Sequence, residues 1–442
     1  MKGRLAALIT VVLALPLAAQ EGRRMSLSLA KAVEIACAPN GATRVQLAAE
    51  LVQQTEARRR QALGALLPNV GGGYTFRSFT NNIAAIGIQF PKIPGLAIPA
   101  LTGPVEVNDV RASATQSLFD LSAIRRYQAS KAQVLAVQAE SDAARNQVKG
   151  AVAKAYLNAV RSEAALDTAR ANVALAERIV KLARSQKDAG TGTGIEITRG
   201  EVTLANEKQR LITATEEHNA AVLQLLRAMN LELDVIPELT GKLRYVPAEI
   251  PAPERAVAAA RELRPELKAQ AERERSASLN YGSAKWERLP SVNAFGDYGV
   301  LGQPGSLTLP TRTAGVSVRI PLWDGGRTDA RRAEAASQLR QESIRTRDTA
   351  RQVELEIRLA VEALKSAEGL VAASREALAQ SERELAQAER RVAAGVASGL
   401  EITDAQARLA RARESQVSAV FRQQAARIDL GVAVGNIDMV LQ

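Results

Sequence analysis

Cysteine and histidine are nearly absent from this chain of 442 residues, and aromatic side chains make up only 3% of it. The single cysteine, Cys37, excludes an intrachain disulfide, and its apolar neighbours predict a small buried side chain. The single histidine, His218, lies between Glu217 and Asn219, so we expect it at the surface and expect no metal site. Few aromatic residues are typical of long packed helices rather than of a thick globular core.

The sequence also lacks the motifs of catalysis. It contains no recognisable Ser-His-Asp or Cys-His arrangement and no phosphate-binding loop. Its two glycine-containing strings, at 190–194 and 395–399, lie between predicted helices, whereas a nucleotide-binding loop lies between a strand and a helix. These absences predict a protein that is not an enzyme and that uses no cofactor.

The net charge of +11 raises the question of nucleic-acid binding. The arginines are, however, interleaved with Glu and Gln along the predicted helices, as in the stretch 382–391. That pattern is typical of a solvated helix face. We therefore expect no nucleic-acid partner.

Long apolar runs are confined to the beginning of the chain. Two basic residues precede an uncharged run from Leu5 to Ala19, and charged residues follow it. A basic start, an apolar stretch of about 15 residues and small residues at its end predict a secretory signal peptide over 1–20. The alternative, an uncleaved membrane anchor, needs about 20 apolar residues. Cys37 lies well beyond the expected cleavage site, so we expect no lipid-modified N-terminal cysteine, and no later segment has the length of a transmembrane helix.

A heptad pattern is abundant, in two stretches about 205 residues apart. Each stretch has one row of mostly large apolar residues and a companion row that consists mainly of Ala and Ser. A period of seven over about five heptads predicts long helices packed side by side, and the small row lets a neighbouring backbone approach closely. The first rows are Val152, Ala159, Leu166, Val173 and Val180, and Ile357, Leu364, Val371, Leu378, Leu385 and Val392. The companion rows are Val148, Ala155, Ser162, Ala169, Ala176 and Ala183, and Val353, Ala360, Ala367, Ser374, Ser381 and Ala388.

Both halves of the chain follow one order: helix, strand, strand, long helix, return helix. Pro68 and Pro290 end the helices that precede the strands. Alternation of apolar with small or polar residues predicts strands at about 69–79, 107–119, 291–301 and 312–321. Each long helix ends at a glycine turn, from which a return helix leads back. We therefore predict two internal repeats after the signal peptide, at 21–248 and 249–442.

Eight aromatic residues lie in or beside the predicted strands: Tyr74, Phe76, Phe79, Phe90, Phe119, Phe295, Tyr298 and Trp323. Outer-membrane barrels place aromatic residues at the membrane interfaces, although small soluble sheets are also rich in them. The exported, mostly helical context without transmembrane helices favours the barrel. Four strands cannot close a barrel, and lipid does not tolerate open edges. Two chains would give eight strands and a filled interior, whereas three give twelve and a lumen, so we expect a homotrimer.

The chain resembles the TolC family of outer-membrane efflux channels along essentially its whole mature length. The motifs that carry the resemblance are LSLAKAVEIA, LLPNVGGGYTF, RPEL and IPLWDGGR, and most specifically AGTGTGIEITRGEVTLANE from Ala189 and AGVASGLEITDAQARLARA from Ala394. The resemblance implies a mainly α fold with a small β part. Long antiparallel helices would form an α-helical barrel in the periplasm, and four strands per chain would contribute to a trimeric 12-stranded barrel in the outer membrane. It also implies a periplasmic adaptor and an inner-membrane transporter as partners.

The resemblance also points to a periplasmic gate after the second glycine turn. Glu401 and Asp404 match the positions of the family's acidic ring, and Glu196 occupies the equivalent place in the first half. Carboxylates repeated around a trimer axis attract cations. The alternative is that these residues only stabilise the first turns of their helices. Val392 and Ala397 stand where the best-known member has a tyrosine and an arginine in its closed-state latch, so that latch is expected to rest on other contacts or to be weak.

The two glycine turns are the predicted contact with the adaptor. By the resemblance, these turns would meet the adaptor tip to tip; the alternative is that they are plain helix-hairpin connections. The residues concerned are Gly190, Thr191, Gly194, Gly395, Val396 and Gly399.

The sequence thus predicts the outer-membrane channel of a tripartite efflux system. Such a channel is a passive exit duct for substrates that an inner-membrane pump exports through a periplasmic adaptor. Two alternatives stay open: the outer-membrane component of a type I protein secretion system, and an exported soluble coiled-coil scaffold. The scaffold would explain the heptads but not the aromatic-rich strands in both halves. The sequence does not distinguish drugs, metals and proteins as cargo.

Overall fold

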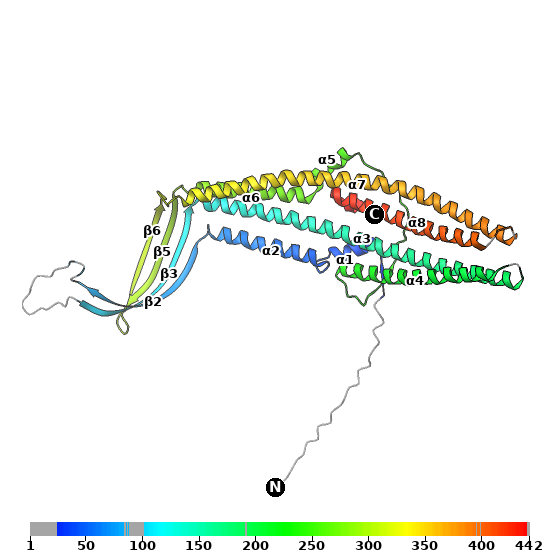
Figure 1. Ribbon diagram of the computed structural model, residues 1–442. Helices are drawn as coiled ribbons and strands as arrows, with labels where there is room; N and C mark the ends of the chain where they lie inside the picture. Colours follow the sequence, from blue (N-terminus) through cyan, green and yellow to red (C-terminus); the bar gives the residue numbers. More distant parts are fainter. Residues whose placement is uncertain are drawn as a thin grey trace, which may run out of the picture.

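The computed structural model describes residues 24–83, 85, 87, 101–190, 192–394, 396–397 and 399–439. Within these residues the chain is mainly helical and elongated, with a four-stranded sheet at one end and the tips of two helical hairpins at the other (Figure 1). The predicted signal peptide and Phe90 lie outside the described residues.

Four long helices make up most of the length. α3 (Leu121–Asp188) and α7 (Arg327–Ala393) have 68 and 67 residues, and each is followed by a 36-residue helix that runs back along it, α4 (Gly194–Met229) and α8 (Gly399–Val434). At 1.5 Å per residue, α3 and α7 each span roughly 100 Å. The shorter helices are α1 (Leu29–Cys37), α2 (Thr43–Gly64), α5 (Pro253–Leu263) and α6 (Pro265–Trp286), and a 3-10 turn, η1 (Ile437–Met439), follows α8.

An aspartate precedes each of the two longest helices. The Asp120 carboxylate accepts a hydrogen bond from Ala123 N (2.9 Å) at the start of α3. The Asp324 carboxylate accepts hydrogen bonds from the hydroxyl and the backbone N–H of Thr328 in the first turn of α7, and these bonds lower the pKa of Asp324. Both aspartates therefore satisfy N–H groups that have no partner inside the helix.

The sheet contains β2 (Asn69–Asn82), β3 (Leu101–Phe119), β5 (Ser291–Gly302) and β6 (Leu309–Arg319), in that order and antiparallel throughout. β2 and β3 are longer than the alternation indicates, because their pairing continues to Asn82 and Leu101, beyond the point where the alternation of side chains is lost. β6 likewise begins at Leu309 rather than near residue 312. β2 and β6 are the edge strands within the described chain.

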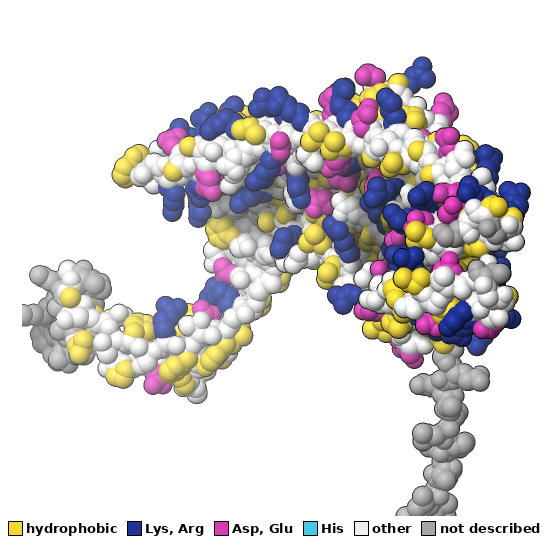
Figure 2. Space-filling model, turned by 45° about the vertical axis from the view of Figure 1, so that its right-hand side comes forward, with side chains coloured by type: hydrophobic (Ala, Val, Ile, Leu, Met, Phe, Trp, Pro, Cys, Tyr) yellow, Lys and Arg dark blue, Asp and Glu magenta, His cyan; other side chains and the backbone are white. Residues whose placement is uncertain are grey.

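The two faces of the sheet differ in character. One face carries large apolar side chains that are exposed, from Val300 (36%) to Val70 (77%): Val70, Tyr74, Phe76, Val110, Tyr298, Val300, Val316 and Val318. The opposite face carries mainly small and polar residues, with Phe79, Phe295, Leu301 and Leu309 among them, and on it Arg111 pairs with Asp109 (3.3 Å) and with Asp297. Hydrophobic side chains line the strand end of the molecule in Figure 2, whereas charged side chains of both signs mix over the helices.

The helices continue the strand order away from the sheet. Next to the sheet, α2 packs on α3, α3 on α6 and α6 on α7. Further along, α4 packs on α3, α3 on α8 and α8 on α7. The edges of this helical layer are therefore α7 on one side and α2 followed by α4 on the other, as β6 and β2 are the edges of the sheet. Among the described residues, no helix is both long and apolar enough to cross a membrane.

The predicted heptad rows form the seams between these helices. Apart from two half-buried members in each helix, all of their residues in α3 and α7 are buried. Ser162 Oγ of the small rows donates a hydrogen bond to Ala159 O of its own helix (2.8 Å) and lies 3.2 Å from His218 Nδ1 of α4. Ser374 Oγ lies 3.1 Å from Val371 O of its own helix and 2.6 Å from Gln416 Oε1 of α8. These hydroxyls therefore have partners at the seams, where neighbouring helices approach closely.

A set of short elements beside the middle of the long helices was not predicted. β1 (Arg24–Leu27) pairs in parallel with β4 (Ile236–Leu239), and four residues are too few to show a periodic pattern. Tyr156 of α3 binds both segments, because its hydroxyl donates to Leu27 O (3.0 Å) and accepts from Gly241 N (2.9 Å). Gln423 of α8, which is fully buried, donates to Val246 O (2.7 Å) and holds the following link against the helices.

Cys37 and His218 are both half-buried. Burial raises the pKa of the Cys37 thiol, which keeps it neutral among its apolar neighbours. His218 Nδ1 lies 3.2 Å from Ser162 Oγ at the seam between α3 and α4, so His218 is not the freely exposed residue that its polar sequence neighbours suggested. The contact was hidden because its partner lies 56 residues away in the sequence.

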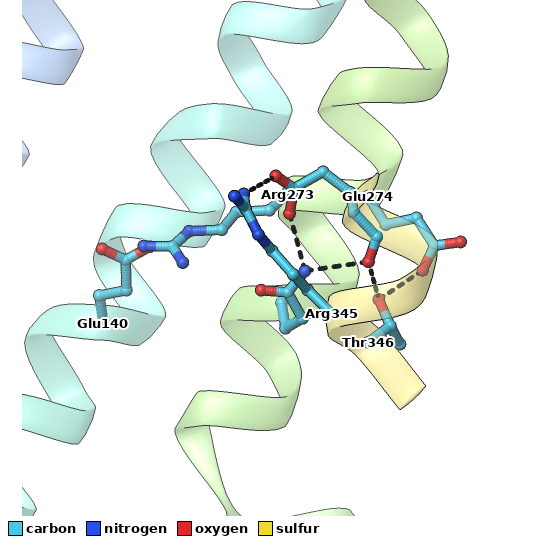
Figure 3. Close-up of polar contacts among 7 residues, drawn as sticks. Glu140, Arg273, Glu274, Arg345 and Thr346 are labelled. Carbon is cyan, nitrogen blue, oxygen red and sulfur yellow. Dashed lines mark hydrogen bonds and ion pairs between the residues drawn. The ribbon is translucent and has the colours of Figure 1, made fainter. Parts of the chain in front are cut away.

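Polar contacts join α3, α6 and α7 near the sheet (Figure 3). Arg273 of α6 forms an ion pair of 2.6 Å with Glu140 of α3. On the other side of α6, Glu274 accepts a hydrogen bond of 2.6 Å from Thr346 of α7. These bonds cross both seams of α6, a helix with few large apolar residues.

Arg264 of the RPEL motif, at the junction of α5 and α6, is only 6% exposed. Its guanidinium donates to Ala433 O of α8 (2.9 Å) and pairs with Glu356 of α7 (2.7 Å) and Glu266 of α6 (3.2 Å). One side chain thus holds three helices at a single point.

We expect Arg264→Ala to lower the free energy of unfolding by about 2 to 3 kcal/mol, less than a fully buried pair would lose because Glu356 keeps some solvent. Chemical denaturation followed by circular dichroism measures this loss. Arg261→Ala on α5 is the control, since Arg261 is exposed and has no polar partner within the described residues; it should change stability by less than about 0.5 kcal/mol. Equal effects of the two substitutions would contradict the assigned role.

Candidate functional site at the tips of the helical hairpins

The first tip joins α3 to α4. The chain turns at Gly190, whose φ of +74° favours glycine. Gly190 N donates to Lys187 O (2.9 Å) and Gly192 N to Gln186 O (3.0 Å), which closes the end of α3. Of the predicted contact residues in this turn, Gly190 and Gly194 are exposed, and Thr191 lies outside the described residues.

The second tip joins α7 to α8. Ala394 N donates to Arg390 O (3.0 Å) and Val396 N donates to Arg391 O (3.1 Å). Val396 is 67% exposed, and Gly399, the first residue of α8, is half-buried. Gly395 lies outside the described residues.

Glu196 lies in the first turn of α4 and touches both tips. It forms a capping box with Thr193, in which Thr193 N donates to Glu196 Oε2 (3.0 Å). Its other oxygen, Oε1, accepts a hydrogen bond from Gly399 N at the start of α8 (3.2 Å). These bonds from the backbone N–H groups of Thr193 and Gly399 are the main reason why the pKa of Glu196 is lowered.

The three predicted gate carboxylates occupy three different settings. Glu401 is exposed and pairs with Arg391 of its own hairpin (3.3 Å). Asp404, one turn further along α8, is exposed and has no polar partner within the described part of the chain. The Glu196 carboxylate accepts hydrogen bonds from the backbone N–H groups of Thr193 and Gly399. Of the three, Asp404 is therefore the one whose carboxylate has no polar contact in the described chain.

Apolar packing surrounds Val392, one of the two positions at which this chain lacks the latch residues of the best-known family member. Val392 is buried in a cluster with Leu175 of α3, Leu385 of α7, and Ile402 and Leu409 of α8. Ala397 packs against the same cluster. The side chains of valine and alanine cannot form hydrogen bonds, so neither position supplies a polar latch. Within the described residues, apolar packing and the hydrogen bond between Glu196 and Gly399 join the tips.

A groove of about 660 Å³ lies between α3, α4 and α8, further from the tips. Its lining carries both signs of charge, including Arg161, Glu207, Glu217 and Glu414. Glu207 is only 5% exposed and pairs with Arg210 (3.1 Å). This mixed lining favours no single class of small ligand. Within the described residues, no group of three or more His, Cys, Asp or Glu side chains could hold a metal ion.

One of the two hydrogen bonds of Glu196 has a recognisable signature in the sequence, and the other has none. The pattern Thr193 to Glu196 is the signature of a capping box, and it indicates that Glu196 bonds with its own helix end. Gly399, which supplies the other hydrogen bond, lies 203 residues later. No local pattern could pair them.

With this geometry established, comparison with known proteins identifies the class. The family model described as outer membrane efflux protein matches residues 38–231 and 256–436, which is most of the chain. The chain belongs to the outer membrane efflux protein family.

Particular relatives are distant in sequence. The chain is 25% identical over 244 residues to the outer membrane efflux protein BepC of Brucella suis biovar 1 (strain 1330). That match covers 53% of this chain and 51% of BepC, about half the length of that curated relative.

Solved structures share the fold over nearly the whole chain. The Campylobacter jejuni CmeC outer membrane channel has a TM-score of 0.80 at 16% identity, covering 92% of this chain and 86% of CmeC. The open state of the Neisseria gonorrhoeae MtrE outer membrane channel has a TM-score of 0.74 at 18% identity, covering 92% of this chain and 89% of MtrE.

The lowered pKa of Glu196 predicts how the tips respond to acid. A carboxyl whose folded-state pKa is lowered contributes stability that is complete above its ordinary value, 4.5, and is lost as the pH falls through the lowered value. We expect hydrogen–deuterium exchange in the first turns of α4 and α8, corrected for intrinsic rates, to be equal at pH 7 and pH 5.5 and to increase only below pH 4.5. The first turn of α1, capped by the Ser28 hydroxyl, is the internal control. Loss of protection already between pH 7 and pH 5.5 would contradict the assignment.

Proposed function

We propose that this chain is the outer-membrane channel of a tripartite efflux system. It would be a passive exit duct for substrates that an inner-membrane transporter passes on through a periplasmic adaptor. One observation carries the proposal: in the described chain, a sheet with one exposed, largely apolar face and two unpaired edges continues into a layer of long helices. An export signal over 1–20, without N-terminal lipidation, completes the proposed route to the outer membrane.

The sheet supports a barrel built from three copies. In lipid, every backbone N–H and C=O needs a partner, so β2 of one copy would pair with β6 of the next. Three copies of a four-stranded sheet give twelve strands. The apolar face with Val110 and Val316 would then face lipid, and the face with Arg111 and Asp297 would line a polar lumen.

The helical layer supports the same closure. Its edge helix α7 exposes Ile344, Leu355, Leu359 and Leu370. Its other edge exposes Leu47 and Leu51 on α2, and Ile212 and Leu223 on α4. Burying these side chains between neighbouring copies would remove apolar surface from water along the whole length. The matching lengths of α3 and α7, and of α4 and α8, support an origin from two structural repeats, 21–248 and 249–442.

The hairpin tips are the proposed periplasmic end. Glu401 and Asp404, repeated in three copies, would form an acidic gate, with Glu196 beside it. The adaptor would meet the mostly small residues of the two turns, Gly190, Thr191, Gly194, Gly395, Val396 and Gly399, of which Gly190, Gly194 and Val396 are exposed in the described chain. Turns without bulky side chains let the helices of another protein approach closely.

The two alternative functions change different parts of this proposal. A type I protein secretion component would keep the assembly and change only the cargo, and no feature of the described residues favours it. A soluble scaffold would have to leave the apolar sheet face in water, which argues against it. Identifying the transporter that copurifies with the channel would separate efflux from secretion.

We expect the purified protein to form trimers in detergent and ion-conducting pores in planar bilayers. A monomer without conductance would overturn the proposal.

A charge on the lipid face of the sheet tests the assignment of the two faces. Val316→Arg places such a charge on the proposed lipid face and should destabilise insertion by about 2 to 4 kcal/mol. Ser317→Arg, the neighbouring residue on the polar face, is the matched control and should leave trimer recovery from outer membranes near the parent level. Equal losses for both substitutions would contradict the assignment of the faces.

The acidic gate predicts a cation preference. We expect the double substitution Glu401→Gln and Asp404→Asn to lower the cation-to-anion permeability ratio by about threefold, because it removes six carboxylates from three copies at the narrow end. Reversal potentials across a salt gradient measure the ratio. Glu216→Gln on α4, which removes one exposed carboxylate per copy away from the tips, is the control. An unchanged ratio in the double variant would remove these residues from the gate.

A further inference from the structure

We propose that the places where the strands meet the long helices bind anionic phospholipid headgroups. These two sheet–helix junctions are residues 118–126, where β3 leads into α3, and residues 322–332, where β6 leads into α7 (Figure 1). Their apolar side chains enter the membrane leaflet next to the helices, and their arginines bind the lipid phosphates. The inference rests on the proposed function, because the sheet must lie in a membrane, and it adds the class of lipid and the residues that select it.

Both junctions have the same order of residue types. Leu, Phe and Asp occupy positions 118–120, and Leu, Trp and Asp occupy positions 322–324. Two consecutive arginines follow in the helix, at 125–126 and at 331–332. Aromatic rings are favoured at the depth of the lipid headgroups, and basic side chains beside them attract anionic lipid. The arrangement, which is present twice in each copy, is therefore suited to the surface of a membrane.

A β-bulge places Phe119 on the apolar face of the sheet. The pairing of β3 with β5 shifts between Ser117 and Phe119, so Phe119 lies opposite Val292. Val292 in turn lies opposite Val318, which belongs to the exposed apolar face. Phe119 therefore ends that face on β3 just before the helix begins, and Trp323, 204 residues later, is its counterpart in the second half.

The apolar pair of the second junction has the most exposed large apolar side chains of the described chain, Leu322 at 92% and Trp323 at 88%. A neighbouring copy would lie beside them, because α7 is an edge helix. The first junction indicates how much such neighbours cover. There β2 and β5 flank β3, and α2 and α6 flank α3, yet Leu118 and Phe119 are still 54% and 47% exposed. We therefore expect the second pair to keep about half of its surface free for lipid in the assembly.

The acidic side chains around the second junction already have partners. Asp324 accepts hydrogen bonds from Thr328. Two further carboxylates form ion pairs: Asp329 with Arg288 (2.5 Å) and Glu287 with Arg331 (3.0 Å). Arg327 and Arg332 are exposed and form no ion pair within the described residues. Both guanidinium groups are therefore available to an anion from outside the chain.

The first junction has a similar surplus of positive charge. Arg125 donates to Gln128 Oε1 (3.1 Å) and Arg126 donates to Ser122 Oγ (3.2 Å), and both acceptors are neutral groups. Guanidinium groups form strong, bidentate hydrogen bonds with phosphate. A zwitterionic lipid carries its own cation beside the phosphate, whereas an anionic lipid does not. The junctions should therefore favour the anionic lipid.

Bromine quenching of tryptophan fluorescence tests the contact with lipid. The chain has two tryptophans, Trp286 and Trp323, so Trp286→Phe leaves Trp323 as the only reporter. In vesicles of phosphatidylcholine and phosphatidylglycerol, we expect lipids brominated near the headgroup to quench Trp323 more than lipids brominated near the chain end. Ala114→Trp, in a chain in which both native tryptophans are replaced by Phe, is the control. Ala114 pairs with Val70 on the apolar face, about 16 Å further from the junction than Phe119, so the opposite order is expected there.

The preference for anionic lipid tests the arginines. We expect brominated phosphatidylglycerol to quench Trp323 at an about three- to tenfold lower mole fraction than brominated phosphatidylcholine. Arg327→Gln combined with Arg332→Gln should reduce this preference by about half or more. Arg347→Gln combined with Arg351→Gln is the matched control, because it removes the same charge from exposed positions of α7 about 30 Å further from the sheet. The control should leave the preference unchanged.

The outcomes separate this inference from the proposed function. Quenching at position 114 without quenching of Trp323 would refute the lipid contact of the junctions and leave the channel in place. Equal preferences in the two double variants would refute the role of the arginines. No quenching at either position would mean that the sheet does not lie in a membrane, and the proposed function would then fail together with the inference.

Discussion

Within the described residues the edges of β2 and β6 are unpaired, and the rest of the structure depends on this constraint. Each edge presents a row of backbone N–H and C=O groups, and burying such groups in an apolar medium without partners costs several kcal/mol apiece. The exposed apolar face that the same four strands carry makes water unfavourable as well. A single copy is therefore suited neither to water nor to lipid, whereas the proposed pairing of identical copies would suit it to both. The helices follow the strand order, so closure of the sheet in the proposed assembly would also determine which helices of neighbouring copies meet.

The helical part solves a different problem, because it must be long without a thick core. Rows of small residues bring α3 and α7 close to their neighbours, and serine hydroxyls in these rows contact carbonyls of their own helices and polar side chains of the neighbouring helices. Where apolar residues are few, ion pairs such as Arg273 with Glu140 join the helices instead. Arg264 then fixes α5 and α6 to α7 and α8 at one buried point. Packed heptad rows, a few ion pairs and the buried Arg264 therefore hold the helices together.

The sequence predicts the elements whose patterns repeat and misses those that depend on distant partners. Most residues of the heptad rows in α3 and α7 are buried at the predicted seams, since a period of seven keeps them on one side of the helix. The family was predicted from the two glycine turns and their flanking motifs, and the family match confirms it. The parallel pair β1 and β4 was missed because four residues show no period. The contact between Glu196 and Gly399 was missed because they lie 203 residues apart, and only folding brings them together.

The seven-residue seam has a consequence for how such a molecule can vary in length. One inserted residue turns the rest of a helix by about 100° and takes its small row out of the seam, whereas seven residues restore the row after about 10.5 Å of added rise. Because α3 and α4 lie against each other, and α7 and α8 likewise, an added heptad in one helix requires another in its partner. The length of the helical part can therefore change only in steps of one heptad, made together in α3, α4, α7 and α8. Relatives that serve cell envelopes of different depth should differ by multiples of that step.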